Sequence, residues 1–219
     1  MDFFSAVIHT IESFLFPQSC LGECGTRDTT LCEKCAQKSP RAHDAPPHTL
    51  VAFSYEGVVK RAIHALKYEN QKECATRLGE LLWHEIGNAL LEEALELSTT
   101  KEVFLIPIPI SRTRLRERGY NQVALVARAL ARESGGSLVL REDVLYKIKD
   151  TESQVRVKDR EKRLKNIAGS FELSPKTEIR GRICVLLDDV ITTGATLKEA
   201  RAILQKGSPA AVIAVAIAH

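Results

Sequence analysis

Two adjacent carboxylates and three threonines lie between an apolar segment and a helix-forming segment, in the stretch ICVLLDDVITTGAT from Ile183 to Thr196. Ligands of open parallel sheets bind beyond the carboxyl ends of the strands, which is where Asp188 and Asp189 would lie. Free N–H groups at the start of the next helix favour a phosphate dianion, and Gly194 lets the backbone come close to it. The stretch therefore predicts a phosphate-binding loop with these candidate residues: Asp188, Asp189, Val190, Ile191, Thr192, Thr193, Gly194, Ala195 and Thr196.

The acidic pair predicts a second ligand group beside the phosphate. Two carboxylates suit the hydroxyls of a ribose, or a Mg²⁺ ion held by hydroxyls and pyrophosphate together. The alternative is a capped helix, because Asp and Thr are common N-cap residues. A cap needs one such residue, whereas this stretch offers five within nine positions. The sequence lacks the G-x-x-x-x-G-K-[ST] pattern, which argues against a P-loop NTPase.

Four of the six cysteines lie within sixteen residues near the amino end, as two close pairs. Such pairs can converge on one zinc ion, which prefers four thiolates in structural sites. Unrelated reduced thiols and a redox pair are the alternatives, and His43 and His48 are spare ligand candidates in the segment that follows. We expect a zinc module whose ligands are Cys20, Cys24, Cys32 and Cys35.

The composition describes an ordinary globular chain of 219 residues, with 44% hydrophobic residues and a formal net charge of +3. It excludes collagen-like, disordered and disulfide-stapled classes. The apolar amino end has no basic region before it, so we reject a signal peptide. The apolar run over 210–218 is too short to span a membrane. We therefore expect a cytoplasmic protein without a membrane span.

Apolar periodicity along the chain predicts the elements that position these groups. Strands that alternate with helices indicate an α/β fold with a parallel sheet and helices on both faces. The expected parts are an amino-terminal helix over 1–17, the cysteine module over 18–40, and a main domain over 50–219, divided into a helical hood over about 50–100 and a core over about 101–219. The expected helices cover 58–66, 78–91, 121–133, 155–165 and 196–206, and the expected strands cover 103–110, 138–140, 183–187 and 211–218.

The stretch from 183 to 196 resembles the signature of the type I phosphoribosyltransferases, in which an apolar strand, paired acids and a threonine-rich loop bind phosphoribosyl pyrophosphate. More narrowly, the chain resembles the ComF family of competence proteins over about residues 18–219. The segments that carry this narrower resemblance are the four-cysteine module, Tyr55 with Leu66-Lys67-Tyr68, Ile106-Pro-Ile-Pro109, Arg118-Gly-Tyr-Asn-Gln122, and the series Gln154, Arg160, Arg163, Asn166 and Phe171.

The resemblance implies a type I phosphoribosyltransferase-like domain that binds phosphoribosyl pyrophosphate with Mg²⁺. Asp188 and Asp189 would then bind the ribose hydroxyls and Mg²⁺, and the loop over 192–196 would hold the 5′-phosphate. Ser111 and Arg112 would face the pyrophosphate, and 118–122 would lie in a flap. The resemblance also implies a role in DNA uptake and natural transformation, with single-stranded DNA and other transformation proteins as partners.

Two basic segments leave a second hypothesis open. Four arginines against Glu117 give +3 over 112–118, and six basic residues against two acids give +4 over 156–165. Such a surface can follow a DNA backbone, serve only the pyrophosphate, or be a solvated helix face. The first hypothesis is a phosphoribosyltransferase, and the second is a non-catalytic DNA-binding or scaffold protein. Candidate DNA or flap residues are Arg114, Arg116, Arg118, Asn121, Gln122, Arg160 and Arg163.

Overall fold

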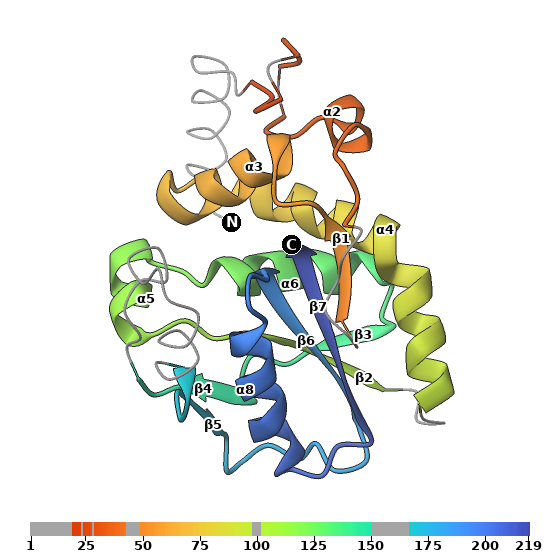
Figure 1. Cartoon of the computed structure of the whole chain (residues 1–219), viewed down its shortest axis with the longest axis vertical. Helices are drawn as coiled ribbons and strands as arrows, with labels where there is room; N and C mark the ends of the chain where they lie inside the picture. The colour runs from red at the N-terminus through yellow and green to blue at the C-terminus, as the bar shows by residue number, and fades with distance from the viewer. Residues whose placement is uncertain (1–18, 23, 28, 43–48, 98–101, 150–166) are drawn as a thin grey trace, which may run out of the picture.

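A parallel sheet forms the centre of the molecule (Figure 1). The computed structural model describes residues 19–22, 24–27, 29–42, 49–97, 102–149 and 167–219. Within these residues a five-stranded sheet has the order β1-β7-β6-β2-β3, and every neighbouring pair is parallel. Its strands are β1 (Thr49–Phe53), β2 (Val103–Pro107), β3 (Leu138–Leu140), β6 (Ile183–Val190) and β7 (Ala211–Ala218).

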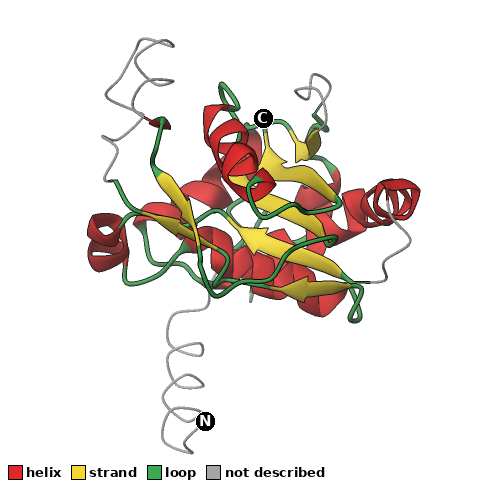
Figure 2. Ribbon diagram, turned by 90° about the horizontal axis from the view of Figure 1, so that it is seen from below, coloured by secondary structure: helices red, strands yellow, loops and turns green. Residues whose placement is uncertain are grey.

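Helices cover both faces of this sheet, as the alternating pattern predicted (Figure 2). Helices α4 (Glu73–Leu97) and α6 (Gln122–Glu133) pack together on one face, and α8 (Ala195–Gln205) packs on the other. Successive residues of β6 therefore enter different cores. Val185 and Leu187 join the core under α4 and α6, whereas Cys184 and Leu186 join the core under α8. This alternation explains why the strand is a continuous apolar run, since both of its faces are buried.

Smaller elements surround the sheet, and two of them lie near the carboxyl ends of its strands. Helix α3 (Gly57–Tyr68) lies beyond the ends of β6 and β7, and α5 (Arg112–Arg118) follows β2 (Figure 1). Strands β4 (Leu145–Lys147) and β5 (Phe171–Leu173) form a separate antiparallel pair. The short helix α2 (Glu33–Gln37) belongs to the cysteine segment and packs against α3.

The structure adds four features that the sequence pattern did not predict. Strand β1, within the range expected as a helical hood, is instead an edge of the main sheet. Helix α4, from the same range, covers a face of that sheet, so α3 is the part of 50–100 that lies over the strand ends. The β4–β5 pair and helix α5 were also not expected. Three-residue strands and a seven-residue helix carry too little periodicity to stand out in a single sequence.

The expected strand over 103–110 ends earlier, at Pro107. The N–H of Ile108 still donates to the carbonyl of Leu187, at 2.8 Å, but Pro109 has no N–H with which to continue the ladder. The expected helices over 1–17 and 155–165 lie outside the described residues, as do His43 and His48. Within the described part of the chain, no helix combines the length and apolar character needed to cross a bilayer.

Candidate functional site

A cavity of about 570 Å³ opens at the carboxyl ends of β2 and β6. Helix α3 borders it on one side and α5 on another, and α8 begins at its edge. The cavity combines three carboxylates with four basic side chains, so it suits a ligand that carries several negative charges and some hydrogen-bond donors. Its lining residues are Tyr55, Lys67, Tyr68, Ile108, Pro109, Ile110, Arg114, Glu117, Arg118, Gln122, Val123, Lys147, Asp188, Asp189, Val190, Thr192 and Thr196.

Asp189 lies at the end of β6 and is almost fully enclosed. Its side chain is 11% exposed, and its two carboxylate oxygens are both occupied. The ammonium of Lys67, on α3, lies 2.9 Å from Oδ1, and the amide nitrogen of Gln122, on α6, donates to Oδ2 at 2.9 Å. Burial lowers the pKa of Lys67, but the Asp189 carboxylate outweighs this, so the pKa lies above its ordinary value. Lys67 is therefore charged at neutral pH.

Asp188, the preceding residue, is less enclosed and lines the cavity. Its Oδ1 accepts a hydrogen bond from the backbone N–H of Asp189 at 2.9 Å. Among the described residues, the other oxygen has no hydrogen-bond partner. Burial and the charge of Asp189 raise the pKa of Asp188 to about 7, although the Asp189 N–H, Lys67 and Lys147 act in the opposite direction.

The loop after β6 turns directly into α8, as the sequence predicted. Gly194 has a φ of 70° at the N-cap of α8, a left-handed conformation that glycine adopts without strain. The first N–H groups of a helix have no acceptor within the helix, and they point out of its end toward the loop. A small second pocket lies here, and it is lined by Asp188 and by residues 190–197. The loop, the start of α8 and Asp188 therefore line the same pocket.

Of the predicted ligand residues between β2 and α6, only some line the cavity. Ser111 is buried and caps α5, where its hydroxyl accepts from the N–H of Arg114 at 3.4 Å. Arg112 and Arg116 are exposed and do not belong to the cavity lining, whereas Arg114 and Arg118 do. Positions four apart share a face of a helix, so α5 turns one pair of arginines to the cavity and the other pair away.

Residues 118–122, which the resemblance placed in a flap, join α5 to α6 and have partners on the body of the domain. The amide of Asn121 donates to the carbonyl of Ile108 at 3.0 Å while its oxygen caps α6. The hydroxyl of Tyr120 donates to the carbonyl of Leu66 at 2.6 Å. Arg118 donates to the side-chain oxygen of Gln122 at 2.8 Å. Arg160 and Arg163 lie outside the described residues.

The four cysteines of the amino-terminal segment form a cluster, as predicted. Their sulfur atoms all lie within 4.8 Å of one another. Four thiolates around a tetrahedral zinc ion would be about 3.8 Å apart, because Zn–S bonds are about 2.3 Å long. The N–H groups of Gly22 and Cys32 donate to the sulfur of Cys20, at 3.3 and 3.4 Å. Hydrogen bonds with Thr26 lower the pKa of Cys24 to about 6, which favours the thiolate that a metal requires.

Comparison with known proteins agrees with this geometry. The family described as phosphoribosyl transferase domain matches residues 118–219. The chain is 30% identical over 197 residues to the DNA utilization protein YhgH of Escherichia coli O6:H1, which covers 84% of this chain and 82% of that protein. It is 34% identical over 146 residues to competence protein F of Haemophilus influenzae, which covers 66% of this chain and 60% of that protein. The chain belongs to the ComF family.

Among solved structures, a hypoxanthine phosphoribosyltransferase from Staphylococcus aureus aligns with this ComF-family chain over 64% of its length and 62% of the other chain. The sequence identity is 16% and the TM-score is 0.36.

Several cavity residues of this ComF-family protein were not assigned to the site from sequence. Lys67, Tyr55 and Tyr68 come from the hood range, Glu117 from α5, and Lys147 from β4. The sequence offered one indication of Lys67, its position in the last turn of α3 next to the apolar face of that helix. A single sequence does not reveal that this lysine meets a carboxylate 122 positions later.

The cysteine segment is tied to the helices of the domain. Arg61 of α3 donates to the carbonyl of Leu21 at 2.6 Å, and Arg77 of α4 donates to the carbonyl of Leu31 at 3.1 Å. The side chain of Leu31 is fully buried in the core under α4 and α6. This segment therefore packs as part of the main domain.

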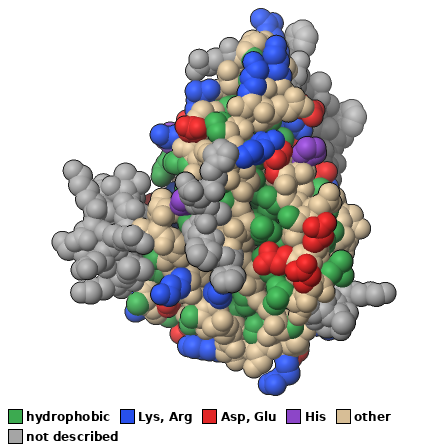
Figure 3. Space-filling view, turned by 45° about the vertical axis from the view of Figure 1, so that its right-hand side comes forward, with side chains coloured by type: hydrophobic (Ala, Val, Ile, Leu, Met, Phe, Trp, Pro, Cys, Tyr) green, Lys and Arg blue, Asp and Glu red, His purple; other side chains and the backbone are tan. Residues whose placement is uncertain are grey.

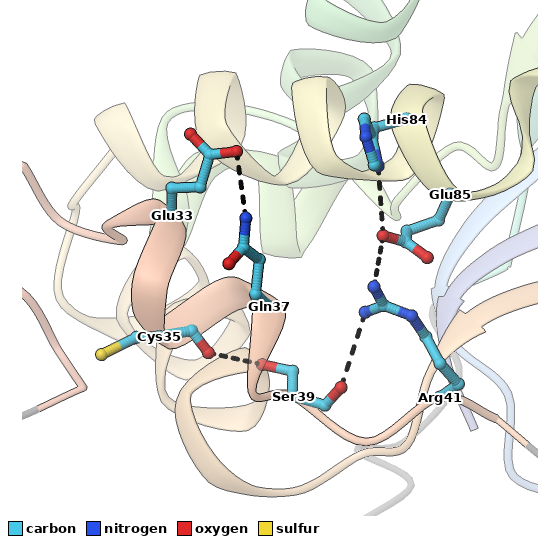
Figure 4. Close-up of polar contacts among 7 residues, drawn as sticks. All are labelled: Glu33, Cys35, Gln37, Ser39, Arg41, His84 and Glu85. Atoms are coloured by element: carbon cyan, nitrogen blue, oxygen red, sulfur yellow. Dashed lines mark hydrogen bonds and ion pairs between the residues drawn. The ribbon is translucent and has the colours of Figure 1, made fainter.

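Polar contacts continue this attachment beyond α2 (Figure 4). Within the segment, the hydroxyl of Ser39 donates to the carbonyl of Cys35 at 3.2 Å. Arg41 then forms an ion pair with Glu85 of α4 at 2.5 Å. Lys and Arg side chains gather at the end of the molecule that carries this segment, and Asp and Glu gather lower on the face that α4 covers (Figure 3).

Proposed function

We propose that this protein binds phosphoribosyl pyrophosphate with Mg²⁺ and transfers the phosphoribosyl group to an acceptor. One observation carries this proposal. Asp188 and the loop over 190–197 line one pocket at the end of β6, and that pocket adjoins the larger cavity. A 5′-phosphate on the loop would put the ribose next to Asp188, with the cavity left for the pyrophosphate.

The reaction would break the bond between the anomeric carbon and the pyrophosphate oxygen and form a bond to the acceptor. The bonding electrons leave with pyrophosphate, and the sugar gains oxocarbenium character in the transition state. Arg114 and Arg118 line the cavity and would offset the charge of the leaving group. Oxygen ligands suit Mg²⁺, and the open carboxylate oxygen of Asp188 fits this donor class. The ion would supply further neutralisation of the pyrophosphate.

Calorimetric titration of phosphoribosyl pyrophosphate, with and without Mg²⁺, tests this function. We expect binding that depends on Mg²⁺ and that falls about a hundredfold in Asp188→Asn, since a charged ligand-facing oxygen is lost. Asp143→Asn is the matched control, because Asp143 pairs with Arg141 on the surface away from the cavity. Wild-type protein that is folded but binds no phosphoribosyl pyrophosphate would overturn the proposal.

We infer that the four clustered cysteines hold one structural zinc ion. Four thiolates close the coordination shell, so no position remains for a reacting water. Elemental analysis should find about one zinc per chain in wild type and in Asp188→Asn, and none in Cys32→Ser. A metal-free wild-type protein with unchanged stability would contradict this assignment.

A second candidate function is DNA handling, which the name DNA utilization protein YhgH suggests for that relative. The observation that favours it here is helix α5, whose exposed arginines Arg112 and Arg116 face away from the cavity. Single-stranded DNA should then bind with an affinity that falls steeply with salt. Arg112→Glu with Arg116→Glu should remove that binding and keep the binding of phosphoribosyl pyrophosphate. DNA affinity that is independent of salt would contradict backbone contacts.

A further inference from the structure

The two adjacent carboxylates occupy opposite sides of the sheet. Side chains alternate along a strand, and in β6 the even positions Cys184 and Leu186 face α8 while the odd positions Val185 and Leu187 face α6. Asp188 continues the even series toward the start of α8. Asp189 continues the odd series toward α3 and α6, where its partners lie.

The contacts of the two carboxylates differ in the same way. Asp189 is held on both oxygens, by Lys67 and by Gln122, at 2.9 Å each. Asp188 has one oxygen held by the backbone, and it lines the small pocket of the loop, which Asp189 does not. A ligand seated on the loop would therefore meet Asp188 first, whereas Asp189 borders only the larger cavity and both of its oxygens already accept a hydrogen bond, from Lys67 and from Gln122.

Three successive residues of α3 anchor this arrangement. The carbonyl of Leu66 accepts from Tyr120, the ammonium of Lys67 pairs with Asp189, and the ring of Tyr68 lies 5.3 Å from the guanidinium of Arg118. The last turn of α3 is thus fastened to the end of β6 and to the α5–α6 junction. The Lys67 side chain is 17% exposed, so loss of either partner would leave a largely buried charge unpaired, which costs more than breaking a surface pair.

We propose that Lys67 is a positioning residue that locks Asp189, and that this lock leaves Asp188 as the carboxylate that contacts the ligand. Asp189 is then part of the framework of the site, although it belongs to the same sequence motif. The inference rests on the proposed function, because the ligand in question is phosphoribosyl pyrophosphate. It assigns unequal roles to two neighbouring acids and adds a residue of α3 to the site.

A double-mutant cycle separates positioning from direct ligand contact. The variants are Lys67→Gln, Asp189→Asn and their combination, and the readout is the dissociation constant for phosphoribosyl pyrophosphate with Mg²⁺. If Lys67 acts through Asp189, each single change weakens binding about tenfold and the combination weakens it no further. Lys67→Arg keeps a cation at this position and should recover most of the affinity. Lys60→Gln, on the exposed side of the same helix, is the control for lost charge.

Other outcomes overturn the proposal. Additive losses of about a hundredfold in the double variant would mean that Lys67 contacts the ligand itself. An unchanged affinity in Lys67→Gln would mean that the ion pair does not position the site. The same cycle on thermal unfolding without ligand tests the lock alone. If wild type binds no phosphoribosyl pyrophosphate, the proposed function fails, and uncoupled unfolding effects of the two residues would then overturn the lock as well.

Discussion

The cysteine cluster and the acidic pair are both groups of like side chains brought close together, but the chain assembles them differently. The four cysteines lie within sixteen residues, and short backbone contacts such as Cys20 N–H to Thr26 carbonyl, at 2.9 Å, hold them. The acidic pair depends on Lys67 and Gln122, which are 122 and 67 positions away from Asp189. The cysteine cluster is a local structure, whereas the partners of the acidic pair reach it only when the whole domain has folded.

The two regions also differ in the source of the cation that offsets their negative charge. Thiolates packed within 4.8 Å repel one another once they ionise, so a cation is the natural stabiliser of the cysteine cluster. At the acidic pair the cation is already supplied by the chain, as the ammonium of Lys67. With the proposed zinc ion in place, the chain balances clustered negative charge by a metal in one region and by a lysine in the other.

The largest expected effect follows from opening the cysteine cluster. Cys32→Ser removes a thiolate and, with it, the proposed zinc ion, whose binding free energy would stabilise this segment. Because Leu31 is buried in the main core, we expect the loss to spread to α3 and α4 and to lower the stability of the domain by several kcal/mol. Thermal unfolding together with metal content checks this. Asp188→Asn is the control: it should retain zinc, and at low pH its thermal stability should remain close to that of wild type.

The second effect concerns pH and distinguishes the acidic pair from the cysteine cluster. The pKa of Asp188 is raised from 3.8 to about 7, so the folded state holds a proton that the unfolded chain has lost between about pH 4 and 7. The contribution of Asp188 to stability therefore falls as pH rises through this window, by at most about 4 kcal/mol. Urea unfolding at pH 5 and pH 8 should show a smaller fall in Asp188→Asn than in wild type. Equal falls in both proteins would contradict the raised pKa.

The same contrast explains how far the sequence could predict the structure. The strand–loop–helix unit around Gly194 and the cysteine pairs are local patterns whose residues carry their own geometry, and both occur as predicted. The parallel sheet followed from the alternation of apolar runs with amphipathic ones. Even the opposite directions of Asp188 and Asp189 follow from the two-residue repeat of a strand.

What the sequence could not predict is pairing between distant segments. Strand β1 forms the sheet edge only because β7 offers it a parallel partner, from Thr49 opposite Ala214 to Phe53 opposite Ala218. The family resemblance implied that Ser111 faces the pyrophosphate. The helix that it caps is seven residues long and has no buried residues, so the sequence pattern did not reveal the helix or the role of Ser111 as its N-cap.

A third prediction tests the link between the two regions. Arg61→Ala removes the hydrogen bond from α3 to the carbonyl of Leu21, which joins the cysteine segment to the helix that carries Lys67. A charged donor to a backbone carbonyl contributes about 1.5–3 kcal/mol, less where it is exposed, so we expect a loss of about 1–2 kcal/mol. Urea unfolding measures it, and Lys60→Ala, one residue earlier on the exposed side, is the matched control. Equal stability in the two variants would show that this contact does not join the regions.

The smallest effect is expected at Ser111, where a structural role and a ligand role lead to different results. As the N-cap of α5, its hydroxyl accepts from Arg114, so Ser111→Ala should cost about 1 kcal/mol of stability. Ser111→Asn keeps a capping oxygen and should recover that stability. Because α5 carries Arg114 and Arg118 into the cavity, ligand affinity should follow the same order, lowered in Ser111→Ala and restored in Ser111→Asn. If the hydroxyl instead contacted the pyrophosphate, the asparagine would restore stability without restoring affinity, and the calorimetric titration would separate the two roles.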